Sequence, residues 1–273
     1  MKYFTAFLLS LLFYCSPFQG KVIEMENLSL LEEKVGGFNS DTLVLFDVDN
    51  TLIMLSDAVL QPQGKQLSKS LISKIQNWTN TIKYPDGFLL GKVLLAAKWD
   101  VVDPKNVPLI QQLQERNIPV LAFTGAGTKK VGEIESFADF RIEQLERHGF
   151  NFKKTLNLPD DFQFANEVLL KSGVLFCSEQ SKGDVLKTFL KEFQLSPQKI
   201  VFIDDRKDFI ESVEEAMSEI GIECFCIHYT AIENTSVILD EKIAEFQFHH
   251  LFENGEWLSD EHANAHLSSR IGS

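Results

Sequence analysis

The sequence has few cysteines and no excess of positive charge, and these two deficits exclude several classes of protein. It contains 4 cysteines in 273 residues, at Cys15, Cys177, Cys224 and Cys226. Cys224 and Cys226 lack a second pair at the spacing of a zinc site, so we interpret them as packing residues of a strand. With 26 basic and 39 acidic residues, the net charge of −13 disfavours a general nucleic-acid binder, because such proteins present basic patches.

Long apolar runs are missing after the first twenty residues, so no later segment is predicted to span a bilayer. Residues 1–20 have the order of a secretory signal: Lys2, the apolar run Tyr3–Tyr14 and a polar exit. The large side chains of Phe13 and Phe18 stand where a cleavage site needs small residues, which leaves an uncleaved N-terminal anchor open. We therefore expect an exported protein, either periplasmic or secreted.

Apolar residues make up 44% of the chain, and they form short buried-strand patterns that alternate with helical patterns. The strand patterns are Leu43–Phe46, Ile118–Phe123, Lys199–Ile203 and Ile222–Ile227. The helical patterns are Ser68–Trp78, Val107–Arg116, Lys129–His148, Ser181–Glu192 and Asp208–Ile220. This alternation predicts an α/β fold with a doubly wound parallel sheet.

Three other segments carry weaker patterns. A β-hairpin is predicted from Phe162–Leu170 and Val174–Cys177. Residues 21–40 are expected to be a polar lead-in with one short amphipathic segment. Gly91–Trp99 is apolar throughout, which is compatible with either a helix or a strand.

The first strand pattern leads directly into Asp47 and Asp49, within the run T-L-V-L-F-D-V-D-N-T of residues 42–51. Residues two apart in a strand point to the same side, so the two carboxylates would lie together at the strand's carboxyl end. Open α/β sheets bind ligands at that edge. Two close carboxylates repel each other unless a cation or a proton lies between them, which indicates a metal site or an acid/base pair. The alternative is an acidic turn followed by a helix cap.

Polar residues also follow the later strands. Thr124 and Gly125 end the second strand, where a hydroxyl and free amides suit phosphate binding, although a simple turn has the same sequence. Lys182 stands at the start of a helix. Asp204 and Asp208 follow the third strand, where acidic residues also serve as helix caps.

Taken in order, these residues resemble the four-motif signature of the haloacid dehalogenase-like (HAD) superfamily. The motifs are Asp47-Val48-Asp49-Asn50-Thr51, Thr124, Lys182, and Asp204 with Asp208, and F-D-V-D-N-T-L at 46–52 is the most specific of them. The resemblance covers roughly residues 43–228 and implies a Rossmann-like core with cap inserts. More narrowly, the exported start, A-F-T-G at 122–125 and W-L-S-D at 257–260 resemble an uncharacterised family of exported HAD-like proteins from intracellular bacteria.

The resemblance implies a role for each motif residue. Asp47 is the expected nucleophile, which forms an aspartyl-phosphate intermediate, and Asp49 is the expected general acid and base. Thr124, Gly125 and Lys182 are expected to hold the phosphoryl oxygens.

Mg²⁺ is the expected cofactor, with ligands from Asp47, the Val48 carbonyl, Asp204 and Asp208. Ile203 replaces the small residue usual before the fourth-motif aspartate, so the ligand is either Asp204 or Asp205, and the Asp204-x-x-x-Asp208 spacing favours Asp204. The motif lysine follows a hairpin, which leaves Lys171 as an alternative to Lys182.

The predicted protein is a Mg²⁺-dependent phosphohydrolase that acts on a small phosphorylated substrate. Its core spans 38–54, 103–130 and 176–245, with cap inserts at 55–102 and 131–175 and a C-terminal tail, 246–273, packed on the core. Caps set substrate specificity in this superfamily. A non-catalytic binding or scaffold protein and a phosphotransferase are the alternatives.

Overall fold

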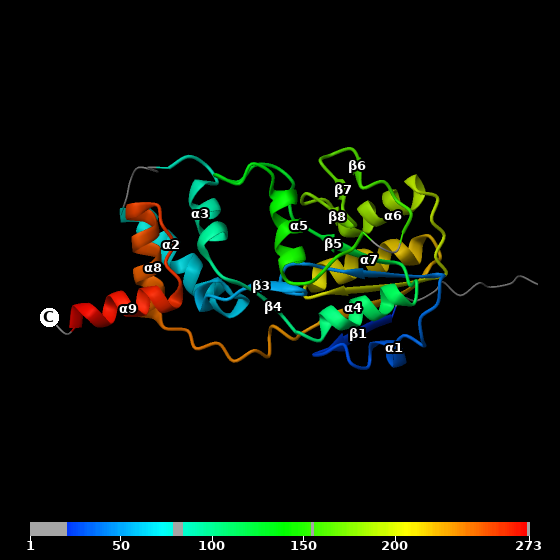
Figure 1. Cartoon of the computed structure of the whole chain (residues 1–273), viewed down its shortest axis with the longest axis horizontal. Coiled ribbons are helices and arrows are strands. Elements are labelled where there is room, and N and C mark those ends of the chain that lie inside the picture. Colours follow the sequence, from blue (N-terminus) through cyan, green and yellow to red (C-terminus); the bar gives the residue numbers. More distant parts are fainter. Residues whose placement is uncertain (1–20, 79–83, 154–155, 272–273) are drawn as a thin grey trace, which may run out of the picture.

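The centre of the protein is an eight-stranded sheet in the order β1-β10-β9-β2-β5-β8-β7-β6 (Figure 1). The computed structural model describes residues 21–78, 84–153 and 156–271. The strands of the sheet are β1 (Lys21–Met25), β2 (Thr42–Phe46), β5 (Val120–Thr124), β6 (Asp161–Gln163), β7 (Leu169–Lys171), β8 (Val174–Phe176), β9 (Lys199–Asp204) and β10 (Glu223–Tyr229). Neighbours from β1 to β8 in this order are parallel, and β7 and β6 add an antiparallel edge.

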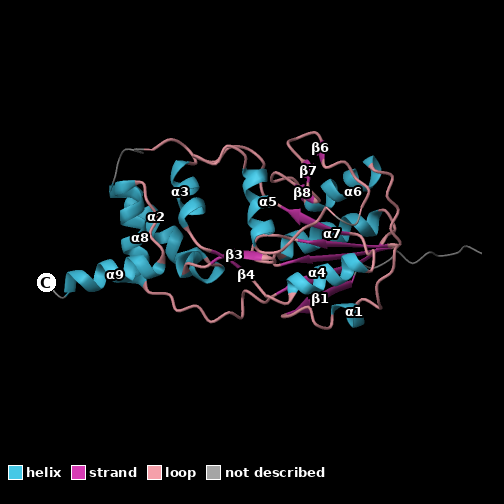
Figure 2. Cartoon of the chain, in the orientation of Figure 1, coloured by secondary structure: helices cyan, strands magenta, loops and turns pink. Residues whose placement is uncertain are grey.

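Helices cover both faces of the sheet. Successive residues of a strand point to opposite faces, and they belong to two different apolar clusters. In β2, Val44 and Phe46 pack into one core, whereas Leu43 and Leu45 pack into the other. Residues of α1 (Leu31–Lys34), α4 (Asn106–Glu115) and α5 (Phe137–Arg147) belong to the first core. Residues of α6 (Lys182–Glu192) and α7 (Lys207–Glu219) belong to the second. The predicted doubly wound α/β sheet is confirmed (Figure 2).

Some elements differ from their predicted positions. Strand β1 lies in the segment expected to be a polar lead-in and pairs with β10 at the edge of the sheet. Helix α5 begins at Phe137 and not at Lys129, because a β-bridge joins Val131 to Ile134 and the Ser136 hydroxyl then caps the helix. The apolar segment Gly91–Trp99, for which the sequence allowed a helix or a strand, forms the end of a helix, α3 (Phe88–Ala96), and then reaches the first residue of a strand, β4 (Trp99–Val101).

The predicted hairpin exists in part and belongs to the main sheet. Its expected first strand, Phe162–Leu170, is divided into β6 and β7, and only β7 pairs with β8. Strands β7 and β8 are joined by Ser172 and Gly173, whose φ angles of 52° and 74° suit a two-residue hairpin turn. Strand β6 then pairs with β7. Much of the segment expected as a second cap insert, 131–175, therefore extends the core sheet, because β8 adds directly to β5.

A second lobe lies beyond the carboxyl ends of the central strands (Figure 1). The insert after the first motif enters and leaves this lobe through an antiparallel ribbon of β3 (Ile53–Leu55) and β4 (Trp99–Val101), and the chain returns to the lobe after β10. The lobe contains α2 (Lys65–Trp78), α3, α8 (Glu241–Asn254) and α9 (Asp260–Ile271), with two 3-10 turns at Ala58–Leu60 and Pro62–Gly64.

The C-terminal helices complete this second lobe and do not pack on the sheet, so the predicted packing of the tail on the core is wrong. The apolar side chains of Phe248 and Leu251 on α8 share a cluster with Leu71 and Ile75 of α2 and Val93 of α3. The helices of the insert expose apolar faces that the sheet cannot reach, and α8 covers them.

The predicted export signal, residues 1–20, lies outside the described part of the chain. Within the described ranges, no helix combines the length and hydrophobicity needed to cross a bilayer. Cys224 and Cys226 are buried free thiols, as expected of packing residues, and Cys177 is buried and free as well.

Trp257 fastens the C-terminal segment to the insert. Its indole Nε1 donates a hydrogen bond of 2.8 Å to Oδ2 of the buried Asp57, and the backbone N–H of Asp260 donates one of 2.9 Å to Oδ1. Burial raises the pKa of Asp57, although both hydrogen bonds favour its charged form. The carboxylate therefore depends on these donors.

We expect Trp257→Phe to lower the free energy of unfolding by about 1.5–3 kcal/mol, because it removes a hydrogen bond to a buried charged group. Urea denaturation followed by circular dichroism measures the change. In a double-mutant cycle with Asp57→Ala, the two losses should be strongly non-additive; additive losses would show that the indole contributes by packing alone.

Candidate active site

Three central strands bring the predicted motif residues to one edge of the sheet. Strand β2 lies between β5 and β9, and all three run parallel. Asp47 follows β2, Thr124 is the last residue of β5, and Asp204 is the last residue of β9. The strand order therefore places residues from distant parts of the sequence at the same carboxyl edge.

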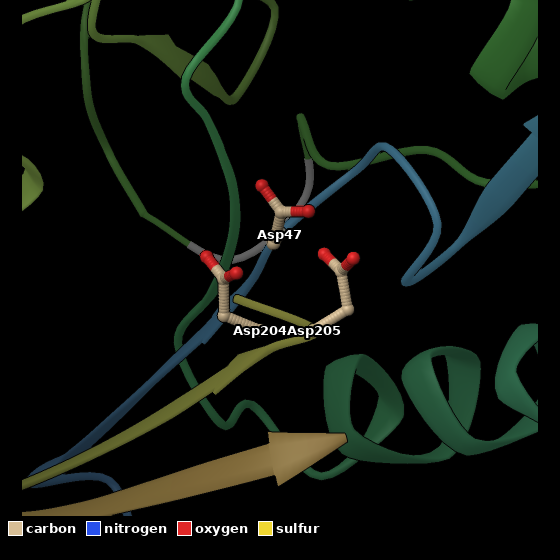
Figure 3. A group of neighbouring side chains, drawn as sticks. All are labelled: Asp47, Asp204 and Asp205. Atoms are coloured by element: carbon tan, nitrogen blue, oxygen red, sulfur yellow. The ribbon is translucent and has the colours of Figure 1, made fainter. Parts of the chain in front are cut away.

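Asp47, Asp204 and Asp205 form an acidic cluster at this edge. One carboxylate oxygen from each lies within 4.8 Å of the others, and Figure 3 shows the three side chains around a common space. Asp47 is 4% exposed and Asp204 is fully buried. The sequence left Asp204 and Asp205 as alternative metal ligands, and both belong to the cluster.

The ammonium group of Lys182 lies beside this cluster and has no contact with solvent. Its Nζ lies 2.6 Å from Asp47 Oδ1, 2.6 Å from Asp204 Oδ2 and 2.6 Å from the Phe123 carbonyl oxygen. An ammonium group has three donors, so all of them are used. Lys182 therefore has no donor left for a phosphoryl oxygen in this arrangement.

Local structure at the start of α6 allows this deep insertion. The Ser181 hydroxyl caps the helix by accepting a hydrogen bond from the Asp184 backbone N–H. Gly183 then faces α7, where a Cβ atom would come within 2.1 Å of the Ser212 carbonyl oxygen. The absence of a side chain lets α6 approach α7 closely and directs Lys182 toward the strand ends.

The cluster has more negative charge than Lys182 can balance. Burial raises the pKa of Asp47 well above its usual value, and the nearby charge of Asp204 raises it further, against the opposing effect of Lys182. Burial and Asp204 raise the pKa of Asp205 to about 7. The carboxylates of Asp204 and Asp47 outweigh the burial of Lys182 and raise its pKa. Close oxygen donors with excess negative charge are the setting in which a hard divalent cation binds, so the residues fit Mg²⁺.

Asp49 has a different environment from Asp47. Its side chain is 41% exposed, and one carboxylate oxygen lies 2.7 Å from Arg141 Nη2. The Thr124 hydroxyl lies 3.4 Å from the other oxygen and itself accepts a hydrogen bond from the Ala126 backbone N–H. Gly125 lies between Thr124 and Ala126 in the turn after β5.

Arg141 is a site residue that sequence reasoning missed. It projects from α5, is 3% exposed, and its guanidinium carbon lies 4.6 Å from the ring centre of Trp99 and 5.1 Å from that of Phe137. Its Nε and Nη1 atoms have no hydrogen-bond partner among the described residues, so the ion pair with Asp49 is its main polar contact there. An arginine ninety residues after the first motif has no local pattern that reveals this contact.

Two of the expected metal ligands are not brought to the cluster. The side chain of Asp208 is 62% exposed and forms an ion pair with Arg206, because it lies on the first turn of α7 and turns back toward that guanidinium. The Val48 carbonyl oxygen accepts hydrogen bonds from the backbone N–H groups of Leu52, at 2.9 Å, and Ile53, at 3.1 Å, so both of its lone pairs are used.

Lys171, the alternative to Lys182, is also not in the cluster. Its Nζ lies 2.6 Å from Asp139 Oδ1 on α5. Lys182 is therefore the lysine that contacts Asp47.

Comparison with known proteins relates nearly the whole described chain to one family. The family model for "Protein of unknown function (DUF2608)" matches residues 24–264. An uncharacterized protein of Rickettsia prowazekii (strain Madrid E) is 25% identical over 232 residues, which cover 82% of each chain. A protein of Chlamydia trachomatis named "Putative outer membrane protein" is 27% identical over 209 residues, which cover 75% of each chain.

Among solved structures, a hydrolase of the haloacid dehalogenase-like family from Streptococcus pneumoniae aligns with 67% of this chain and 82% of its own, at 16% identity and a TM-score of 0.38. Similarity of this degree assigns neither the fold nor a function. The fold assignment given above follows from the strand order.

We expect Lys182→Met to lower the free energy of unfolding by about 3–5 kcal/mol at pH 7 in EDTA, because it leaves buried carboxylates without their partner. The loss should be smaller at pH 5, since carboxyl groups whose folded-state pKa is raised take up protons as the pH falls. Chemical denaturation at the two pH values measures this difference.

Lys171→Met is the matched control, because it removes a lysine whose ion pair is with an exposed carboxylate. It should cost less than about 1 kcal/mol and show little dependence on pH. Equal losses in the two variants would contradict the role of Lys182 in balancing the acidic cluster.

Proposed function

The chain belongs to the family described as Protein of unknown function (DUF2608), and we propose that it is an exported, Mg²⁺-dependent phosphohydrolase of the HAD type. The observation that carries this proposal is the contrast between two aspartates at one strand end. Asp47 is buried and fixed by Lys182, whereas Asp49 is partly exposed and held by Arg141. A carboxylate held in one orientation suits attack on phosphorus, and a carboxyl group that reaches solvent suits proton exchange with the leaving oxygen and with water.

In the proposed reaction, a carboxylate oxygen of Asp47 attacks the phosphorus atom and forms an aspartyl phosphate. The bond from phosphorus to the ester oxygen breaks, and Asp49 gives its proton to the departing alkoxide. Asp49 then accepts a proton from the water that attacks the aspartyl phosphate. Inorganic phosphate leaves, and the Asp47 carboxylate and the protonated Asp49 are restored.

The remaining site residues would prepare Asp47 and the phosphoryl group. Lys182 holds the Asp47 carboxylate in one orientation, and the Thr124 hydroxyl and Gly125 amide are the proposed donors to phosphoryl oxygens. Mg²⁺, held by Asp47, Asp204 and Asp205, would supply the positive charge that lets a phosphate dianion approach these carboxylates.

Export is part of the proposal because two independent indications agree. Residues 1–20 have the order of a secretory signal, and the related chlamydial proteins carry the name "Putative outer membrane protein". Both indications support export, and we propose a periplasmic or secreted location.

The test is hydrolysis of p-nitrophenyl phosphate by residues 21–273, with Mg²⁺ and with EDTA. We expect turnover that requires Mg²⁺ and falls by at least about 10³-fold in Asp47→Asn, because the nucleophile is lost. Asp205→Asn should raise the Mg²⁺ concentration needed for half-maximal rate, whereas Asp208→Asn should leave that concentration within a few-fold of wild type.

A wild-type protein that is inert with and without Mg²⁺, and that Mg²⁺ does not stabilise in a thermal shift, would overturn the enzyme and favour a binding protein of the same fold. Formation of a phosphorylated alcohol when alcohols are added would indicate a phosphotransferase. A larger loss in Asp208→Asn than in Asp205→Asn would contradict the assignment of the metal ligands.

Arg141 is the proposed positioning residue for Asp49. We expect Arg141→Met to slow the reaction by up to about 10²-fold, because a misplaced acid transfers its proton poorly. The loss should be larger for an alkyl phosphate than for the initial burst with p-nitrophenyl phosphate, since p-nitrophenolate leaves without needing a proton. Stopped-flow and steady-state assays measure the two losses; equal losses would indicate a purely structural arginine.

A further inference from the structure

A cavity of about 550 Å³ lies between the acidic cluster and the second lobe. On the core side its wall includes Asn50, Asp205 and Arg206. On the side of the second lobe it includes Ile72 of α2, Leu90 of α3 and Phe252 of α8. The cavity is therefore built where the two lobes face each other (Figure 1).

The cavity is continuous with the site of the proposed chemistry. Asp205 contributes a carboxylate oxygen to the acidic cluster and also lines the cavity wall. Asn50, the residue directly after the proposed acid Asp49, lines it as well. A substrate whose phosphoryl group meets the cluster therefore has this cavity available for the rest of the molecule.

The wall of the cavity on the second lobe is mainly apolar. Its apolar residues are Val59, Leu60, Ile72, Leu89, Leu90, Val93, Phe248, Leu251 and Phe252. Leu90 leaves 54% of its surface exposed and adds apolar surface to this wall.

Two polar side chains of this wall already use their donors within the protein. The Ser68 hydroxyl donates its hydrogen bond to the Val59 carbonyl oxygen, and the Gln61 amide nitrogen donates to the Ser56 carbonyl oxygen. The Gln61 Oε1 atom has no partner among the described residues, but it is buried away from the surface of the wall. Lys65 and Lys69 also line the cavity, and neither has a carboxylate partner among the described residues. The cavity thus offers an apolar wall with positive charge beside it, which suits an anionic amphiphile and disfavours a polyol.

We propose that the substrate is a phosphomonoester of an apolar alcohol, a monoalkyl phosphate whose chain lies in this cavity. The inference rests on the proposed phosphohydrolase function and adds the class of the leaving group. The alkyl chain contacts apolar residues of α2, α3 and α8, and the positive charges of Lys65 and Lys69 favour the entry of an anionic substrate into the cavity.

The first test compares a series of n-alkyl phosphates from ethyl to decyl with glycerol phosphate and p-nitrophenyl phosphate. We expect kcat/KM to rise by about fourfold for each added methylene until the cavity is filled, since each buried methylene contributes transfer free energy. Turnover of p-nitrophenyl phosphate with no dependence on chain length would overturn the inference and leave the phosphohydrolase standing.

Binding is measured in parallel by calorimetry with ethyl phosphate and decyl phosphate in Mg²⁺. Tighter binding of decyl phosphate supports the cavity even if no phosphate ester is hydrolysed, in which case the failure belongs to the proposed reaction. Equal affinities would overturn the inference whatever the activity.

Two leucines of α3 provide a matched pair of variants. Leu90 lines the cavity and is 54% exposed, whereas Leu95 does not line it and is 51% exposed. We expect Leu90→Gln to lower the ratio of kcat/KM for decyl over ethyl phosphate by about tenfold, and Leu95→Gln to leave that ratio unchanged. An unchanged ratio in Leu90→Gln, or equal changes in both variants, would overturn the proposed location of the chain.

Discussion

The contact on which the site depends is the buried ammonium of Lys182. It joins carboxylates at the ends of β2 and β9 to the Phe123 carbonyl on β5, so three strands and the start of α6 meet at one charged group. Burial alone would lower the pKa of a lysine, but here the two carboxylates outweigh the cost of burial and raise the pKa of Lys182. The same contact holds Asp47 in place. Lys182 brings one positive charge to three carboxyl groups, so it does not balance the whole cluster.

The two aspartates of the first motif, Asp47 and Asp49, have different surroundings. Asp47 and Asp205 share the space in which oxygen ligands converge, whereas Asp49 turns toward Arg141. Arg141 keeps its place by packing against Trp99 and Phe137, so the strand ribbon and α5 both contribute to the position of Asp49. The proposed division between nucleophile and acid thus depends on packing as much as on charge.

The second lobe forms one wall of the cavity in which we propose that the substrate lies. Its helices come from the insert after the first motif and from the C-terminal segment, which Trp257 fastens to Asp57. Phe248, Leu251 and Phe252 of α8 line the cavity. A change in the C-terminal segment therefore acts on the proposed substrate pocket although it lies far along the chain from Asp47.

The sequence by itself determined the α/β class, the central parallel strands and the strand ends that bear Asp47, Thr124 and Asp204, because a strand buried on both faces is a short continuous apolar run that can be recognised locally. Only the tertiary structure decided that Asp205 faces the cluster while Asp208 turns to Arg206, since spacing along a chain does not specify where a side chain points. It also decided the contact of Arg141 with Asp49 and the position of α8. Both features depend on packing between segments that lie far apart in the sequence, and no local pattern of residues predicts such packing.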